Sequence, residues 1–234
     1  MRAGDADRPV ADSESEAVPR LLEALRAAFG PQDWWPAQNP FEVLVGAVLT
    51  QNTAWRNVEQ ALARLRERNW LSPEAILAAP LEALADCLRP SGYYNVKSRR
   101  LRAACEQWLA LGGEAGLAAM ETGALRAALL EVKGLGPESV DDVLLYGFER
   151  PVFVVDAYTR RIFSRLGLVS PGIGYERLQA LFHASLPADA ERFNEFHALV
   201  VMLGKHCCRP RRPRCHACPL QADCGHARAL PQRS

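Results

Sequence analysis

Residues 129–145 read LLEVKGLGPESVDDVLL, and two apolar stretches in this segment flank the turn GLGP at 134–137. The apolar residues on both sides recur at three- and four-residue spacing, which predicts one helix before the turn and another after it. The two glycines free the backbone of the turn, and Pro137 suits the first position of the second helix. The segment therefore reads as a helix–hairpin–helix, with the carboxylate of Glu138 two residues past the second glycine.

The turn has the features of a small anion site. Gly134, Leu135 and Gly136 can expose consecutive backbone N–H groups, and the helix that follows points the positive end of its dipole outward. Such a site suits a nucleic-acid phosphate and reads no base. An ordinary turn between two helices is the alternative that the segment alone leaves open.

Helical periodicity continues through most of the chain, and strand-like alternation is almost absent. The stretch at 152–155 is apolar but too short, and too near a helix start, to count as a strand. Glycine and proline clusters separate the periodic segments. The sequence therefore predicts an all-α protein with helices over 18–29, 41–49, 54–68, 73–88, 95–110, 122–131, 137–147, 156–166, 174–186 and 190–204.

The 234-residue chain is 49% hydrophobic, which is enough to bury a core. No apolar run reaches the ~20 residues that a membrane span needs, and no signal-peptide pattern is present. We therefore expect no membrane contact and a cytoplasmic protein. The net charge of +1 conceals an acidic segment, residues 1–17, which reads as a disordered arm. The remainder is correspondingly more basic, with clusters at 97–102 and 205–214.

Four of the seven cysteines lie within one short loop, in the spacing Cys208-x6-Cys215-x2-Cys218-x5-Cys224. Structural zinc sites usually join two close pairs across a longer element, whereas a cubane iron–sulfur cluster suits four thiolates on one loop. The residues favour a [4Fe-4S] cluster, with zinc and unligated cysteines as alternatives. The loop also carries Arg209, Arg211 and Arg212, which either face phosphates or keep the loop solvated.

Asp156 directly follows the apolar stretch VFVV and precedes a predicted helix. Aspartate is among the best N-cap residues, and a fixed carboxylate at a helix start can also take part in a reaction. The two roles are compatible.

Aromatic side chains mark two other segments. Trp34 and Trp35 stand before Pro36, and tryptophans either pack a core or stack on a flat, electron-poor ring. Tyr93 lies in PSGYYNVKSRR, where aromatic and basic residues alternate as in a wedge that enters DNA. Tyrosines half-buried at a helix cap are the alternative.

The order of these motifs closely resembles that of the endonuclease III branch of the helix–hairpin–helix DNA glycosylases. The residues that carry the resemblance are QNT at 51–53, GYYNVK at 92–97, KGLGP at 133–137, VVD at 154–156 and the cysteine loop, and the resemblance covers roughly residues 20–225. The resemblance implies that the hairpin clamps a DNA phosphate and that Cys208, Cys215, Cys218 and Cys224 hold a [4Fe-4S] cluster.

The resemblance also implies a chemistry. Bifunctional members carry a lysine nucleophile at the position of Glu138, and a carboxylate cannot form a Schiff base, so strand cleavage should be weak or missing. Asp156 matches the catalytic aspartate. Glu138 would hold water, pair with a cation or touch the extruded base.

A finer resemblance is to the monofunctional 3-methyladenine DNA glycosylases. It rests on WWP at 34–36, LTQNT at 49–53, PSGYYN at 90–95, KGLGPES at 133–139, VVDAY at 154–158 and FNEFHALVV at 193–201. It implies a pocket for a damaged base formed by Trp34, Trp35, Pro36 and His197. The expected function is hydrolytic removal of a damaged base, an alkylated purine, from DNA, with little or no strand cleavage. Leu199 stands near the position of a modified lysine in some members and cannot replace it.

We therefore expect two helical lobes with DNA in a cleft between them, and a monomeric enzyme. Residues 38–150 would form the hairpin lobe, 18–37 with 151–226 the cluster lobe, and 227–234 a tail. Tyr93, with Asn52 or Gln51, would fill the gap left by the flipped nucleotide. The alternatives are a bifunctional glycosylase and lyase for oxidised pyrimidines, and a DNA-damage-binding protein without catalysis. The first needs another amine in place of the missing lysine, and Lys133 lies close in sequence but on the wrong side of the turn.

Overall fold

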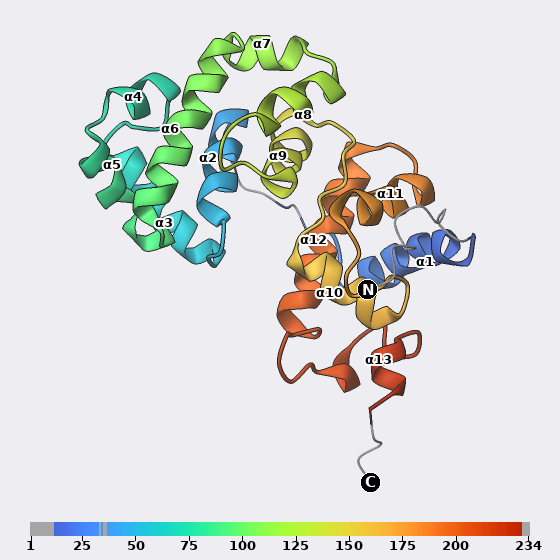
Figure 1. Ribbon diagram of the computed structural model, residues 1–234. Helices are drawn as coiled ribbons and strands as arrows, with labels where there is room; N and C mark the ends of the chain where they lie inside the picture. The colour runs from blue at the N-terminus through green and yellow to red at the C-terminus, as the bar shows by residue number, and fades with distance from the viewer. Residues whose placement is uncertain (1–11, 33, 35–36, 231–234) are drawn as a thin grey trace. The chain divides into compact units, whose positions relative to one another are not determined.

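The computed structural model describes residues 12–32, 34 and 37–230, which are built mainly from helices (Figure 1). None of these residues forms a β-strand, so the predicted all-α class is confirmed. The chain divides into two compact units, one of residues 35–150 and one of residues 1–34 with 151–234. Within the described ranges, no helix is both long enough and apolar enough to span a membrane.

The unit of residues 35–150 is built around α2 (Pro40–Thr50), in which every residue from Phe41 to Leu49 is buried. A helix that is apolar on all sides needs neighbours on all sides. These neighbours are α3 (Trp55–Glu67), α6 (Tyr94–Ala110), α9 (Pro137–Asp142) and the π-helical turn η2 (Val143–Gly147). Figure 1 shows α2 lying among them. The helix predicted over 137–147 is therefore α9 continued by η2.

The segment predicted as one helix over 73–88 is two helices, α4 (Pro73–Ala78) and α5 (Leu81–Leu88). Pro80 separates them because proline lacks an N–H and disfavours helical backbone in the residue before it. Both helices pack against α6. The single turn η1 (Arg89–Ser91) follows α5, and α7 (Gly113–Ala119), which the sequence did not predict, precedes α8 (Thr122–Leu130).

The other unit contains α1 (Asp12–Phe29), α10 (Ala157–Leu166), α11 (Tyr175–Ser185) and α12 (Ala190–His206). The short elements η3 (Cys215–Ala217) and α13 (Gly225–Arg228) lie in its C-terminal loop. α1 packs on α11 and α12, and α10 packs on α12 and α13. The core of the unit is a cluster of buried aromatic rings, formed by Phe153, Phe163, Phe182, Phe193 and Phe196.

The first helix begins inside the segment predicted as a disordered acidic arm. α1 starts at Asp12, so residues 12–17 are helical, while residues 1–11 of the arm lie outside the described range. Acidic residues are favourable in the first turns of a helix because they interact with the positive end of its dipole. The acidic composition that suggested disorder is therefore compatible with a helix start.

The apolar stretch before Asp156 is extended and buried. Side chains rather than a neighbouring strand satisfy its backbone: the N–H of Phe153 donates to Nε2 of His183 at 3.0 Å, and its carbonyl accepts from Nε2 of Gln179 at 2.7 Å. The N–H of Val155 donates to the hydroxyl of Tyr175 at 3.3 Å. These bonds to α11 fix the backbone that leads to Asp156.

Candidate functional site

The hairpin of the 35–150 unit has the backbone that its sequence predicts. Gly134 adopts φ +101°, which an L side chain rarely allows, and Gly136 is the residue before α9, with Pro137 in the first position of that helix. The N–H of Leu135 donates to the carbonyl of Val132 at 3.0 Å, and the Leu135 side chain is buried. The side chain of Leu135 therefore anchors the turn while the glycines remain near the surface.

A buried ion pair joins the two helices of the hairpin. Arg126 of α8 donates from Nε and Nη2 to the two carboxylate oxygens of Asp141 in α9, at 2.7 and 3.1 Å. The Asp141 side chain is fully buried. Such a bidentate pair fixes geometry because the guanidinium plane must match the carboxylate plane.

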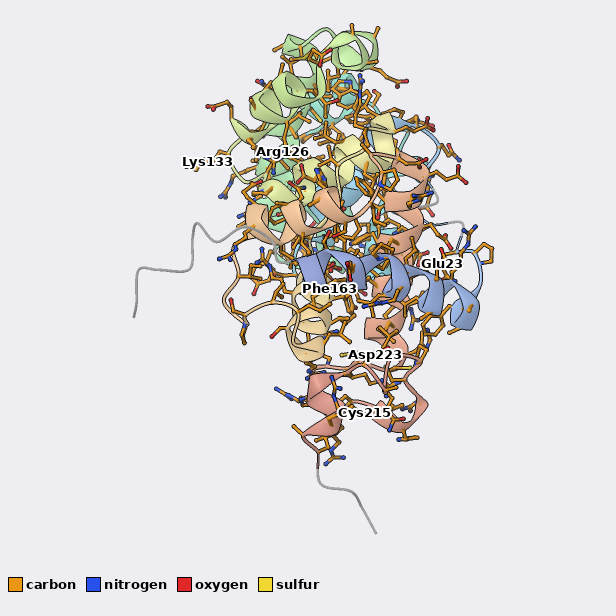
Figure 2. The ribbon with its side chains drawn as sticks, turned by 90° about the vertical axis from the view of Figure 1, so that its right-hand side faces the viewer. Glu23, Arg126, Lys133, Phe163, Cys215 and Asp223 are labelled. Carbon is orange, nitrogen blue, oxygen red and sulfur yellow. The ribbon has the colours of Figure 1, made fainter. Side chains whose placement is uncertain are left out.

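Two charged residues beside the hairpin are exposed. Glu138 lies in the first turn of α9 and Lys133 precedes the turn. Figure 2 shows Lys133 pointing away from the ribbon. An acid in the first turn is favourable there because of the helix dipole.

The candidate wedge residues occupy two turns of the same unit. Tyr93 is 70% exposed and has φ +45°, and Asn52 is exposed with φ +55°. Left-handed backbone is costly for a bulky side chain, by about 1–3 kcal/mol, so the surrounding structure must impose it. Gln51 differs from both: its Nε2 donates to the Gly134 carbonyl at 3.0 Å and to Oγ of Ser139 at 3.1 Å. Gln51 is thus engaged with the hairpin, and Asn52 is the residue presented to solvent.

A buried lysine supports both turns. Nζ of Lys97 donates to the carbonyl of Leu49, in the last turn of α2, at 2.8 Å and to the carbonyl of Ser91, at the end of η1, at 2.7 Å. The residue is 1% exposed. Burial, aided by repulsion from Arg100, lowers the pKa of Lys97 from 10.5 to about 8. The lysine closes two helix ends whose carbonyls have no partner within their own helix.

Asp156 is the N-cap of α10 in the other unit. Its Oδ1 accepts from the N–H of Thr159 at 2.7 Å and from the Thr159 hydroxyl at 2.8 Å. Its Oδ2 lies 3.7 Å from Nε2 of His197, and the side chain is 13% exposed. One oxygen therefore caps the helix, which leaves the second for other chemistry.

The electrostatics of Asp156 favour the ionised form. Burial alone would raise its pKa, but the His197 imidazole 3.7 Å away and the two donors of Thr159 outweigh burial and hold the pKa of Asp156 below its ordinary value. The group is a carboxylate at neutral pH. It can stabilise positive charge or accept a proton, and it is not a proton donor.

Trp34 and His197 lie in different surroundings. Trp34 lines a cavity of about 420 Å³ with residues of α1 and α12, including Glu195, and neither Asp156 nor His197 lines that cavity. Nζ of Lys205 is 4.8 Å from the centroid of the Trp34 ring. His197 is buried, with its ring edge-to-face to Phe153. Trp35 and Pro36 lie outside the described residues. Leu199 is fully buried in the core.

The four predicted ligand cysteines are brought together by the C-terminal loop. Cys208, Cys215, Cys218 and Cys224 line one small cavity, together with Cys207, and all are free of disulfides. Figure 2 places Cys215 on this loop. Burial raises the pKa of Cys218 to about 11. In the described part of the chain, no three His, Cys, Asp or Glu side chains approach closely enough to hold a single metal ion.

Two arginines of helix α10 contact the cysteine loop, and neither was predicted from the sequence as a site residue. Nη1 of Arg165 lies 3.3 Å from Sγ of Cys208 and 2.7 Å from the carbonyl of Arg209. Nε of Arg161 donates to the carbonyl of Cys208 at 2.8 Å. The helix capped by Asp156 therefore also positions the loop. Of the predicted phosphate-facing arginines, Arg211 and Arg212 are exposed and Arg209 is partly buried.

Comparison with known proteins places this arrangement among DNA repair proteins. The family model described as "HhH-GPD superfamily base excision DNA repair protein" matches residues 45–188. Over 216 residues the chain is 38% identical to "Putative DNA repair glycosylase MJ1434" of Methanocaldococcus jannaschii, covering 91% of this chain and 98% of that protein. Endonuclease III of Thermotoga maritima is 32% identical over 190 residues, covering 80% and 83%.

Solved structures have the same fold. A non-covalent endonuclease III–DNA complex matches with a TM-score of 0.80 at 24% identity, covering 92% of this chain and 96% of that one. The H. pylori 3-methyladenine DNA glycosylase bound to 1,N6-ethenoadenine matches with a TM-score of 0.67 at 29% identity, covering 82% and 97%.

Proposed function

The chain belongs to the HhH-GPD superfamily of base excision DNA repair proteins and is a DNA glycosylase; on this premise we propose that it removes an alkylated purine from DNA by hydrolysis, without cleaving the strand. The proposal rests on two carboxylates, one beside the hairpin and one at the N-cap of α10. Glu138 stands at the hairpin where a lyase requires an amine, and Asp156 is held as a carboxylate beside His197.

DNA binding would use the hairpin and the arginines of the cysteine loop. Gly134, Leu135 and Gly136 offer backbone donors to one phosphate. Arg209, Arg211 and Arg212 offer cationic donors that contact the backbone without reading sequence. Such contacts position the protein along the duplex, and specificity for damage then depends on extrusion of the base.

Two exposed side chains would stabilise DNA from which a base has been extruded. We assign Tyr93 and Asn52 to the gap in the duplex, because both are exposed on turns held by Lys97. Gln51 is assigned to the hairpin, where its amide is already bonded. Extrusion costs least at a damaged pair, which contributes to selectivity.

In the reaction, the bond between C1′ and the base nitrogen breaks and its electron pair leaves with the base. A purine alkylated at N3 or N7 is positively charged, so it departs as a neutral molecule and needs little help from an acid. The Asp156 carboxylate stabilises the positive charge that develops on the sugar and orients the attacking water. Water adds its oxygen to C1′ and releases a proton, so the products are a free base and an abasic sugar.

The proposed base pocket lies at His197, beside Asp156, with Trp35 and Pro36 as its further candidates, whereas Trp34 lines a different cavity. An aromatic face attracts a cationic ring, which supports an alkylated purine over a neutral oxidised pyrimidine. The likeness to a 3-methyladenine DNA glycosylase supports the same class of substrate.

The cysteine loop would hold a [4Fe-4S] cluster on Cys208, Cys215, Cys218 and Cys224. Four thiolates around a single zinc ion would lie ~4 Å apart, given metal–sulfur bonds of about 2.3 Å. The four thiols line one small cavity, and four cysteines on one short loop suit a cubane cluster. Arg165 fits this assignment because it donates toward the Cys208 sulfur. The cluster, when bound, would act as a structural centre that shapes the loop and its arginines.

The proposal is tested by release of free base from duplex oligonucleotides that contain either an alkylated adenine or an oxidised thymine. We expect release of the alkylated base by the native protein and a loss of about 10²–10⁴-fold in the Asp156→Asn variant. Asparagine retains the capping oxygen, so this variant should remain folded. Release of only the oxidised base would contradict the substrate assignment.

A bifunctional enzyme for oxidised pyrimidines is the second candidate, favoured by the likeness to endonuclease III of Thermotoga maritima. It would need an amine near the reacting sugar, and Lys133 is the exposed lysine beside the hairpin. Borohydride would then trap a covalent complex with DNA that disappears in Lys133→Gln.

A further inference from the structure

Arg100 lies across the hairpin in a space that only glycine leaves open. A Cβ atom added to Gly134 would be 2.5 Å from Cγ and 2.6 Å from Cδ and Nε of Arg100. Gly134 also has φ +101°. The glycine therefore serves two purposes, because it permits the turn and admits the stem of an arginine against it.

Gln51 holds the end of that arginine. Its Oε1 accepts from Nη1 of Arg100 at 2.5 Å, while its Nε2 donates to the Gly134 carbonyl and to Ser139. The amide thus uses its acceptor on the arginine and both of its donors on the hairpin. Arg100 is fixed relative to the turn rather than free to sample many rotamers.

The charge of Arg100 is not neutralised by these contacts. Gln51 is a neutral acceptor, and within residues 37–150 the structure gives Arg100 no acidic partner. One of its five N–H groups is used in the bond to Gln51. A pre-oriented guanidinium with spare donors is suited to a phosphate.

The same contacts extend to the turn at Asn52, which we call the wedge turn. Gln51 is followed directly by Asn52, which is exposed with φ +55°. Lys97 precedes Arg100 by three residues on α6, so the two side chains share a face of the helix. On one face of α6, Lys97 therefore supports the turns at Asn52 and Tyr93, and Arg100 contacts the hairpin.

We propose that Arg100 is a phosphate-binding residue of the hairpin, oriented by Gln51, and that Gln51 holds the wedge turn at Asn52 in register with the bound phosphate. The inference rests on the proposed function, which puts a DNA phosphate at the hairpin. It adds a cationic side chain to a site that otherwise uses backbone donors, and it gives Gln51 a positioning role distinct from that of Asn52.

The test is the salt dependence of binding to an undamaged duplex, measured by fluorescence anisotropy. Losing one phosphate contact should reduce the slope of log K against log salt by about 0.9. We expect this reduction in Arg100→Gln, with affinity lowered about 10-fold as for one charge-assisted hydrogen bond. The matched control is Arg68→Gln, which has the same change of charge. Arg68 ends the 13-residue helix α3, about 20 Å along the helix from the wedge turn.

An unchanged slope in Arg100→Gln, or an equal reduction in Arg68→Gln, would overturn the assignment of Arg100. The role of Gln51 is tested by Gln51→Leu, which preserves all charges. We expect the salt slope of this variant to equal that of the native protein, with a lower single-turnover rate of base release on saturated DNA. An unchanged rate would refute the positioning role. Restoration of the rate in Gln51→Glu is not expected, because a carboxylate cannot donate to the Gly134 carbonyl.

The two proposals can fail separately. If the native protein releases no base but Arg100→Gln still lowers the slope, then the proposed reaction is wrong and the phosphate contact stands. If Asp156→Asn abolishes base release while Arg100→Gln binds as the native protein does, then the reaction stands and the inference about Arg100 is wrong. Thermal unfolding of each variant shows whether a loss reflects misfolding.

Discussion

Replacing Lys97 by methionine should change the stability of the protein by an amount that becomes more unfavourable as pH rises. Methionine has a similar length but donates no hydrogen bond, so the carbonyls of Leu49 and Ser91 lose the donor that now lies 2.8 and 2.7 Å away. Each buried carbonyl left without a partner costs about 1–3 kcal/mol. The native lysine makes both hydrogen bonds at every pH, because its neutral amine also has an N–H donor for each carbonyl. The variant therefore lacks both bonds at every pH.

The pH dependence comes from the charge. Folding lowers the pKa of Lys97 from 10.5 to about 8, so the unfolded chain binds the proton more tightly and the native protein gains stability as pH rises between these values. With these two values, the cost of the buried charge is about 3 kcal/mol at pH ~7 and about 1.5 kcal/mol at pH ~9.5. Lys97→Met avoids that cost at both pH values. The variant should therefore lose about 2 kcal/mol more, relative to the native protein, at the higher pH.

Urea unfolding followed by circular dichroism at the two pH values measures this difference. Other titrating groups cancel because they are common to both proteins. The control is Lys133→Met, an exposed lysine whose replacement should change stability by less than about 0.5 kcal/mol at either pH. If Lys97→Met changes the free energy of unfolding by the same amount at both pH values, then burial does not lower the pKa of Lys97.

Three further predictions concern the hairpin, the carboxylate and the loop. Gly134→Ala should weaken duplex binding in anisotropy measurements, because its Cβ would collide with Arg100; affinity equal to that of the native protein would contradict this. His197 and Thr159 outweigh burial and lower the pKa of Asp156. The single-turnover rate of base release should therefore fall only when the pH drops below the ordinary pKa of a carboxyl group. A loss of rate with a midpoint above that pKa would exclude Asp156 as the titrating group. For the proposed [4Fe-4S] cluster, Arg165→Gln should lose iron to a chelator faster than the native protein, as followed by visible absorbance, because the donor toward Cys208 is lost; equal rates would show that this contact does not stabilise the loop.

Local sequence was sufficient for much of the fold and for the single-residue features of the site. The hairpin follows from two glycines and a proline between periodic apolar segments, and Asp156 follows from its place at a helix start. Both are determined by neighbouring residues. Pro80 carried an equally local signal for the break between α4 and α5, which the periodicity across 73–88 obscured.

The contacts that join these features could not be read in the same way. Gln51 meets Ser139 from 88 residues away, and Lys97 meets Leu49 from 48 residues away. Amide and ammonium groups have many possible partners, so residue type does not identify which carbonyl they will reach. Lys97 did offer one signal, since it lies four residues before Leu101 on the buried face of α6. The distinction between Gln51 and Asn52 needed the tertiary structure.

The central claim is that this glycosylase removes a base and leaves the strand intact. The most direct measurement incubates the native protein with a duplex that contains one alkylated adenine and compares strand breaks before and after hot alkali, with a parallel reaction in borohydride. We predict breaks only after alkali and no covalent complex, with Glu138→Lys as the variant most able to form one. Breaks without alkali, together with a trapped complex of the native protein, would show that an amine does the work and would contradict the claim.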